Sequence, residues 1–226
     1  MAVTAESPVA YPARSLEPPL GVLAAAFAGV FVAGLVISTI RAGGSPFPSP
    51  FADAGDALDY FRDQRAAVRT GAVLQYASAI PLTLFVATIA PRLRRHAEGF
   101  GPALATLGGA LAAVFLFSSG TISWVLTVPE VTADPATVRA LHTLAFLVGG
   151  PANVLSTGLL IAGIAISALP RKALSPLLIR IGLAIACIAL LTTVALTFTA
   201  AAFLLPIARF TGMAWLITAG FRLRRA

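Results

Sequence analysis

One apolar run constrains this chain more than any other feature, because residues 138–169 are hydrophobic almost throughout. About 20 apolar residues already cross the roughly 30 Å hydrocarbon layer of a bilayer, so this run is too long for an ordinary core helix. The whole chain is 58% hydrophobic and 11% charged, whereas soluble domains are about one quarter charged. The sequence therefore predicts an integral membrane protein whose main solvent is lipid.

Six apolar segments are each long enough to span a bilayer. They cover residues 20–40, 71–90, 103–128, 138–169, 176–197 and 203–221, with a short turn expected near 198–202. We expect an all-α, polytopic bundle of six transmembrane helices, forming one domain over residues 20–226 after a disordered tail at 1–19. The first segment exceeds the roughly 7 to 15 apolar residues of a signal peptide, so we interpret it as an uncleaved span.

The basic residues predict how the bundle is oriented. Six crossings leave both termini on one side, which holds ten Lys and Arg residues, against five on the other side. Cytoplasmic loops carry the excess of such residues, so both termini should be cytoplasmic. Arginine greatly outnumbers lysine and alanine dominates the apolar residues, as is typical of GC-rich bacterial genomes, so we expect a bacterial cytoplasmic membrane. The net charge of +7 is then explained by loops that meet lipid head groups, and we expect no nucleic-acid partner.

The one long connection, residues 41–70, is predicted to be extracytoplasmic. It begins with SPFPSPF, whose prolines at 46, 48 and 50 prevent a helix. From Asp53 to Arg69, apolar residues recur at helical spacing, with acidic residues early and basic residues late. We interpret this segment as an amphipathic helix on the outer membrane surface. A solvated extension of the second span, without membrane contact, is the alternative.

Polar side chains within the spans gather in their outer halves, whereas the inner halves are mostly Ala, Leu, Ile and Val. Polar groups in a bilayer are costly and usually face the bundle interior or water. We therefore expect an outward-facing polar cavity. Its predicted ligand-binding residues are Gln75, Tyr76, Trp124, His142, Asn153 and Arg209.

Arg209 stays charged at any relevant pH and needs a partner. One interpretation is an ion pair with a carboxylate of the outer loops (Asp59, Asp63, Glu130 or Asp134), and the other is an anionic ligand. A kink is expected just before it, at Pro206. His142 could titrate or bind a ligand, or it could simply hydrogen-bond a neighbouring helix.

Gly149, Gly150 and Pro151 interrupt the fourth span. The helix could open there and free carbonyl groups near Leu147, as at transporter binding sites, or it could kink and be relieved by Asn153, Ser156 and Thr157. Small residues recur every four positions in the first span (Gly21, Ala25, Gly29, Ala33) and in the third (Ala105, Gly109, Ala113). We interpret both stripes as faces for close helix packing.

The sequence offers no recognisable catalytic constellation. It lacks HExxH, paired intramembrane carboxylates and Ser-Lys or Ser-His pairs on facing spans, so we expect no enzyme, no catalytic residue, no metal and no cofactor. His96 is expected in a cytoplasmic loop, far from His142, which argues against a bis-histidine haem site. Cys187 is the only cysteine, so no intrachain disulfide can form, and we expect it to be a small buried residue.

Three segments carry a resemblance to a known group: SSGTISWVLTVPE at 118–130, LHTLAFLVGGPANV at 141–154 and ARFTGMAWLITAGFRL at 208–223. With them, nearly the whole chain after Pro19 resembles bacterial six-span membrane proteins classed as a domain of unknown function. The resemblance implies the fold class and no functional residue. The leading hypothesis is a protein that binds or transports a small, anionic molecule. The alternatives are an accessory subunit with a membrane-protein partner and, third, a membrane enzyme.

Overall fold

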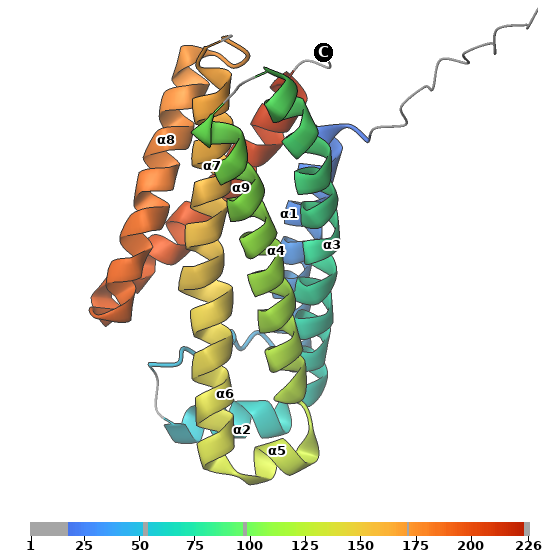
Figure 1. Cartoon of the computed structure of the whole chain (residues 1–226). Helices are drawn as coiled ribbons and strands as arrows, with labels where there is room; N and C mark the ends of the chain where they lie inside the picture. Colours follow the sequence, from blue (N-terminus) through green and yellow to red (C-terminus); the bar gives the residue numbers. More distant parts are fainter. Residues whose placement is uncertain (1–17, 52–53, 97–98, 171, 224–226) are drawn as a thin grey trace, which may run out of the picture.

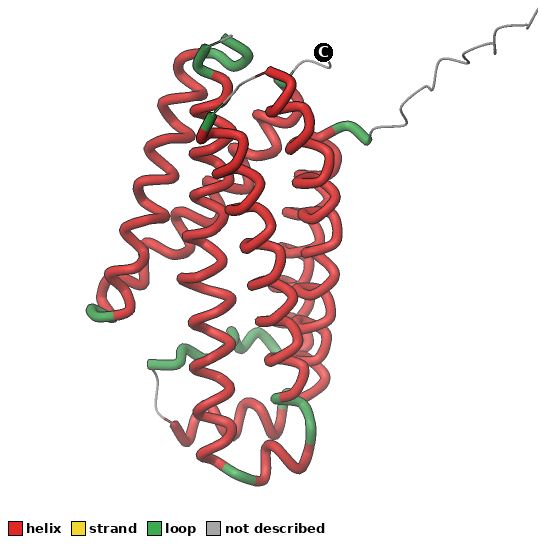
Figure 2. Tube along the Cα trace, viewed as in Figure 1, coloured by secondary structure: helices red, strands yellow, loops and turns green. Residues whose placement is uncertain are grey.

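The computed structural model describes residues 18–51, 54–96, 99–170 and 172–223, which are all-α (Figures 1 and 2). Six helical segments are long and apolar enough to cross a membrane, which confirms the predicted fold class. They are Leu20–Arg41, Arg65–Arg95, Phe100–Val125, Pro135–Ala168, Pro176–Leu196 and Ala200–Arg222. The tail predicted at 1–19 lies outside the described residues except for its last two positions.

The described ranges contain nine α-helices and three other helical turns, of which α2 and α5 lie outside the spans. α1 (Leu20–Arg41) is followed by the short α2 (Ala54–Asp63) and the long α3 (Arg65–His96). α4 (Phe100–Val125) and α5 (Pro129–Ala133) lead to one continuous span made of α6 (Pro135–Leu147), the π-helical turn η1 (Val148–Ala152) and α7 (Asn153–Ala168). α8 (Pro176–Leu191) and η2 (Thr192–Leu196) form the fifth span, and η3 (Thr199–Phe203) with α9 (Leu204–Arg222) forms the sixth.

Consecutive spans lie side by side and close into a ring. Contacts run from α1 to α3, α4, α7, α8 and α9 in turn, and α9 returns to α1. Large apolar side chains fill the centre, among them Phe27, Phe85, Leu160 and Leu216, each no more than 2% exposed. A ring of this kind has an interior toward which polar side chains from every span can turn.

The spans differ in length, and this difference creates a projecting end. At about 1.5 Å per residue, α1 is about 33 Å long, which matches a bilayer, whereas α3 is about 48 Å long. The α6–η1–α7 span is longer still, at 34 residues. The two long spans extend past the end of α1, and α2 and α5 lie across them there, so we name this the cap end (Figure 1). The described chain ends lie at the opposite end of the bundle.

The amphipathic helix predicted over residues 53–69 is divided at Gln64. Residues 54–63 form α2 and those from Arg65 onward belong to α3, and the apolar face of α2 is covered by protein. Ala57 and Phe61 of α2 pack against Val68 of α3, Leu126 just after α4 and Val138 of α6, and Phe61 is fully buried. The sequence suggested that this helix lies on the membrane surface, but its apolar face is turned to the protein and not to the membrane. The periodicity identified the apolar stripe correctly, but it could not show which apolar partner covers that stripe.

The stripe of small residues in the third span serves helix packing, as predicted, because Ala105, Gly109 and Ala113 are all buried. Only part of the stripe in the first span contacts another helix. Gly21 lies against the Phe221 ring, whereas nothing lies within 4 Å of a Cβ added at Gly29. Cys187, expected to be buried, is exposed on α8.

Candidate ligand-binding cavity

A cavity of about 340 Å³ lies between α1, α3, the η1 turn and the first turns of α9. We name it the Arg209 cavity. The proline-rich segment 45–51, which follows the end of α1 and passes behind α6 in the view of Figure 2, contributes to its wall. Its polar lining residues are Ser38, Gln75, Ser119, Ser123, His142 and Arg209, and its apolar ones include Phe31, Leu35, Phe47, Phe146, Leu205 and Phe210.

Arg209 places a charged group at this cavity. Its guanidinium Nη2 donates a hydrogen bond to the Gly149 carbonyl oxygen, and its Cζ lies 5.0 Å from the centre of the Phe31 ring. No carboxylate among the described residues pairs with it, so the ion pair with Asp59, Asp63, Glu130 or Asp134 is absent there. Pro206, where a kink was expected, begins no break within α9. Pro206 lies in the first turn of α9, where its missing N–H costs no helical hydrogen bond.

The η1 turn supplies the acceptor for Arg209. Pro151 has no N–H and its ring crowds the carbonyl of Leu147, so the chain passes this point as a wider π turn without opening. The Asn153 N–H bonds to the carbonyls of Val148 and Gly150. The Gly149 carbonyl is thus left for the arginine. The span therefore stays helical across Pro151 and does not unwind. The hydroxyls of Ser156 and Thr157, expected to relieve a kink, donate to the Ala152 and Asn153 carbonyls of their own span.

Gly149 also lets α4 approach the turn closely. A Cβ at this position would lie 2.1 Å from Oγ of Ser119 and 3.2 Å from Nε2 of Gln75. The Ser119 hydroxyl donates to the Ala145 carbonyl and accepts from Gln75 Nε2, each at 3.0 Å. Three spans are therefore joined beside the cavity by one short chain of hydrogen bonds.

His142 bonds to the proline-rich segment, not to a neighbouring helix as one interpretation expected. Its Nε2 lies 3.2 Å from the Pro48 carbonyl oxygen, and because a carbonyl can only accept, this nitrogen carries the proton. The ring also meets Phe61 edge-on at 5.0 Å and Phe47 at 5.6 Å. His142 thus fastens the segment 45–51 to the wall of the cavity.

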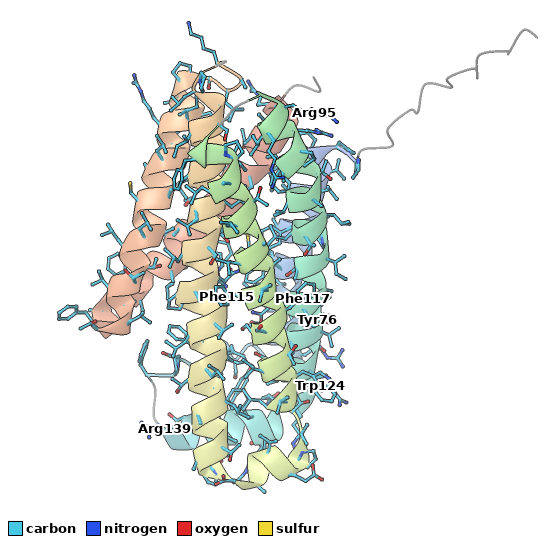
Figure 3. All side chains as sticks on the ribbon, viewed as in Figure 1. Tyr76, Arg95, Phe115, Phe117, Trp124 and Arg139 are labelled. Carbon is cyan, nitrogen blue, oxygen red and sulfur yellow. The ribbon has the colours of Figure 1, made fainter. Side chains whose placement is uncertain are left out.

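Three of the six predicted binding residues do not line the Arg209 cavity. Tyr76 is 47% exposed and packs on Phe117 at 4.8 Å, while Trp124 is 42% exposed (Figure 3). Asn153 is buried and its Nδ2 donates to the Ala112 carbonyl of α4 at 2.8 Å. Gln75, His142 and Arg209 do come together, from three different spans.

Sequence reasoning missed the apolar character of the cavity. Phe31, Phe47, Phe146 and Phe210 shape it, yet in a chain this rich in apolar residues nothing separates an apolar side chain that lines a cavity from one that faces lipid. Ser119 was equally hard to find, because a lone serine in a span usually bonds its own helix. The cavity combines one fixed cationic side chain with a mostly apolar lining, which suits an amphipathic ligand.

The described residues contain no group of three His, Cys, Asp or Glu side chains able to hold a metal ion. No protein-family model, curated protein or solved structure matches this chain. The resemblance to bacterial six-span proteins therefore stays a prediction, and function must be argued from the cavity itself.

Proposed function

We propose that this protein binds, or binds and transports, a small amphipathic anion in the Arg209 cavity. One observation carries the proposal: a half-buried guanidinium faces the cavity with a neutral carbonyl as its hydrogen-bond partner and no described carboxylate beside it. A carbonyl satisfies one donor and leaves the positive charge uncancelled. An anionic group in the cavity would supply the missing counter-charge and accept from the remaining guanidinium donors.

The wall of the cavity supports an apolar body on that anion. Phe, Leu, Val and Ala residues, together with glycines and prolines, make up most of the lining, and its polar side chains other than Arg209 and His142 are the neutral Gln75 and three serines. A volume of about 340 Å³ lies at the small end of the range for ligand pockets, roughly 300 to 1,000 Å³. We therefore favour a single short hydrocarbon chain or ring system with one acidic group.

The orientation follows from the charge distribution in the sequence. The predicted topology assigns ten basic residues to the side of the termini and five to the other side, which favours a cytoplasmic position for the termini. The cap end and the segment 45–51 would then face the outside of a bacterial cytoplasmic membrane. A ligand would reach Arg209 from that side, past Phe47 and Pro48.

Equilibrium dialysis of the detergent-solubilised protein against decanoate and decanol tests the proposal, because these probes share an apolar chain and differ in charge. We expect saturable binding of decanoate and much weaker binding of decanol. Hydrogen bonds to charged groups contribute about 1.5–3 kcal/mol, so Arg209→Gln should weaken decanoate binding roughly 10- to 100-fold. Arg209→Lys should retain part of the binding.

Arg180→Gln is the matched control, because Arg180 is an exposed arginine on α8, remote from the cavity lining. It should bind decanoate as the wild type does. Equal binding of decanoate and decanol, or equal loss in both glutamine variants, would refute the proposal. If the wild type binds neither probe and is isolated in a stable complex with another membrane protein, the accessory-subunit alternative is favoured.

A further inference from the structure

A second hollow at the cap end gathers three arginines from two spans. Arg41 ends α1, and Arg65 and Arg69 lie in the first two turns of α3. We name it the Arg41 hollow. Its lining on α3 (positions 65, 66, 69, 70, 73 and 74) is centred on the opposite side of that helix from the positions that line the Arg209 cavity (68, 71, 72 and 75), and no residue lines both. The two sites are therefore separate.

The positive charge of the Arg41 hollow is not neutralised by the fold. No carboxylate lines it, and none among the described residues pairs with its arginines. Arg65 Nη2 donates to the Thr132 hydroxyl at 3.1 Å, while its Nε is buried without a hydrogen-bond partner. The Arg69 guanidinium lies 5.3 Å from the centre of the Trp124 ring. These contacts hold two of the guanidinium groups in place without cancelling their charge.

The depth of the hollow matches the level of lipid head groups. α1 is about as long as the bilayer is thick, so its last residue, Arg41, should lie at the membrane–water interface. Val73 and Leu74 of the same hollow lie one turn beyond Arg69 toward the membrane centre, and Val73 is 52% exposed. Trp124, 42% exposed beside Arg69, belongs at this interface as well.

We infer that the Arg41 hollow binds the head group of an anionic phospholipid. The phosphodiester would lie between Arg41 and Arg69, whose planar guanidinium groups can each give two parallel hydrogen bonds to phosphate oxygens. The acyl chains would run along Val73 and Leu74. A zwitterionic lipid offers the same phosphate but adds a cation that the arginines repel, so the site should discriminate by net charge.

Native mass spectrometry of the full chain, released from micelles doped with phosphatidylglycerol or phosphatidylcholine, tests this inference. We expect the wild type to retain phosphatidylglycerol preferentially. Each arginine near a membrane surface contributes about fivefold to the attraction of an anionic lipid, so Arg41→Gln with Arg69→Gln should lower phosphatidylglycerol affinity about 25-fold. The single variants should each lose about fivefold, which keeps the test valid if the double variant is unstable.

Arg139→Gln is the control, because Arg139 is an exposed arginine on α6, outside the hollow and well apart from Trp124 (Figure 3). It should retain phosphatidylglycerol like the wild type. Equal retention of the two lipids by the wild type would overturn the inference, as would unchanged retention in the Arg41 and Arg69 variants. Inorganic phosphate that displaces phosphatidylglycerol at millimolar concentration would assign the hollow to a soluble anion, which also overturns it.

Discussion

The contact between α4 and α7 is close enough for a single methyl group to test the packing. A Cβ added at Gly163 of α7 would lie 2.2 Å from the backbone nitrogen of Ala105, 2.7 Å from its Cα and 2.7 Å from the Gly101 carbonyl oxygen. All three atoms belong to the backbone, so no side chain can rotate away. The two helices would have to separate, and they form one of the largest contacts in the ring.

Gly163→Ala should therefore destabilise the bundle. Overpacking of this kind costs about 1–3 kcal/mol, and a clash with rigid backbone belongs at the upper end. The better helix propensity of alanine returns up to about 1 kcal/mol, which leaves an expected net loss of about 2 kcal/mol. Gly29→Ala is the matched control, because nothing lies within 4 Å of its added Cβ. The control should be neutral or gain up to about 1 kcal/mol.

Reversible unfolding in mixed micelles of dodecyl maltoside and sodium dodecyl sulfate, followed by circular dichroism, measures both variants. The quantity to compare is the unfolding free energy of Gly163→Ala and of Gly29→Ala. If Gly163→Ala is as stable as Gly29→Ala, the α4 and α7 backbones are not in contact at this level, and the predicted role of small residues in packing these spans fails.

Three further measurements test other contacts. The pKa of Asp134, which caps α6, is lowered chiefly by the hydrogen bond from the Thr137 hydroxyl, so its stabilising effect is full above the ordinary Asp pKa and is lost as the pH falls through the lowered value. Asp134→Ala should thus lower the melting temperature at pH 7 but not at strongly acidic pH, and an equal loss at both would contradict this. Asn153→Ala should lower the free energy of unfolding by about 1 kcal/mol, because it removes an interhelical hydrogen bond, and it should leave decanoate binding unchanged. Weaker decanoate binding by this variant would show that Asn153 belongs to the ligand site. In a Trp215→Phe variant, brominated lipids should strongly quench the fluorescence of the remaining Trp124. If that quenching is no greater than the quenching of Trp215 in a Trp124→Phe variant, Trp124 does not face lipid.

The spans could be predicted from sequence because hydropathy reports directly on the solvent around a helix. The boundary at Pro176 follows from a proline that begins a helix, and the last span ends at Arg222, one residue past the predicted end at 221. The turn expected near 198–202 is shorter than predicted, because η3 makes residues 199–203 helical. The extension of α3 beyond the bilayer was one of the two alternatives drawn for residues 53–69, whereas the extension of α6 was not predicted. Their projecting turns are covered by α2 and α5, and only the tertiary contact of Phe61 with its neighbours makes that region a compact cap.

Depth along a span was easier to predict than direction around it. Gln75 faces the Arg209 cavity while its neighbour Tyr76 faces away, and Ser123 lines the cavity while its neighbour Trp124 does not. Adjacent residues differ by about 100° around a helix. In spans that are apolar on every side, no periodic pattern fixes which direction is inward, so residues at the right depth were assigned to the cavity whatever their direction.

The hydrogen bond between Arg209 and the η1 turn joins two features that the sequence shows separately: the Gly-Gly-Pro interruption of the fourth span and the arginine of the sixth. Pro151 forces the wider turn, the turn leaves the Gly149 carbonyl without the Asn153 N–H, and the arginine, 60 residues away, takes that carbonyl. A carboxylate in the same place would have satisfied the hydrogen bond and also neutralised the charge. Because the acceptor is neutral, the fold can hold a guanidinium within an apolar wall and still leave its positive charge available to the cavity.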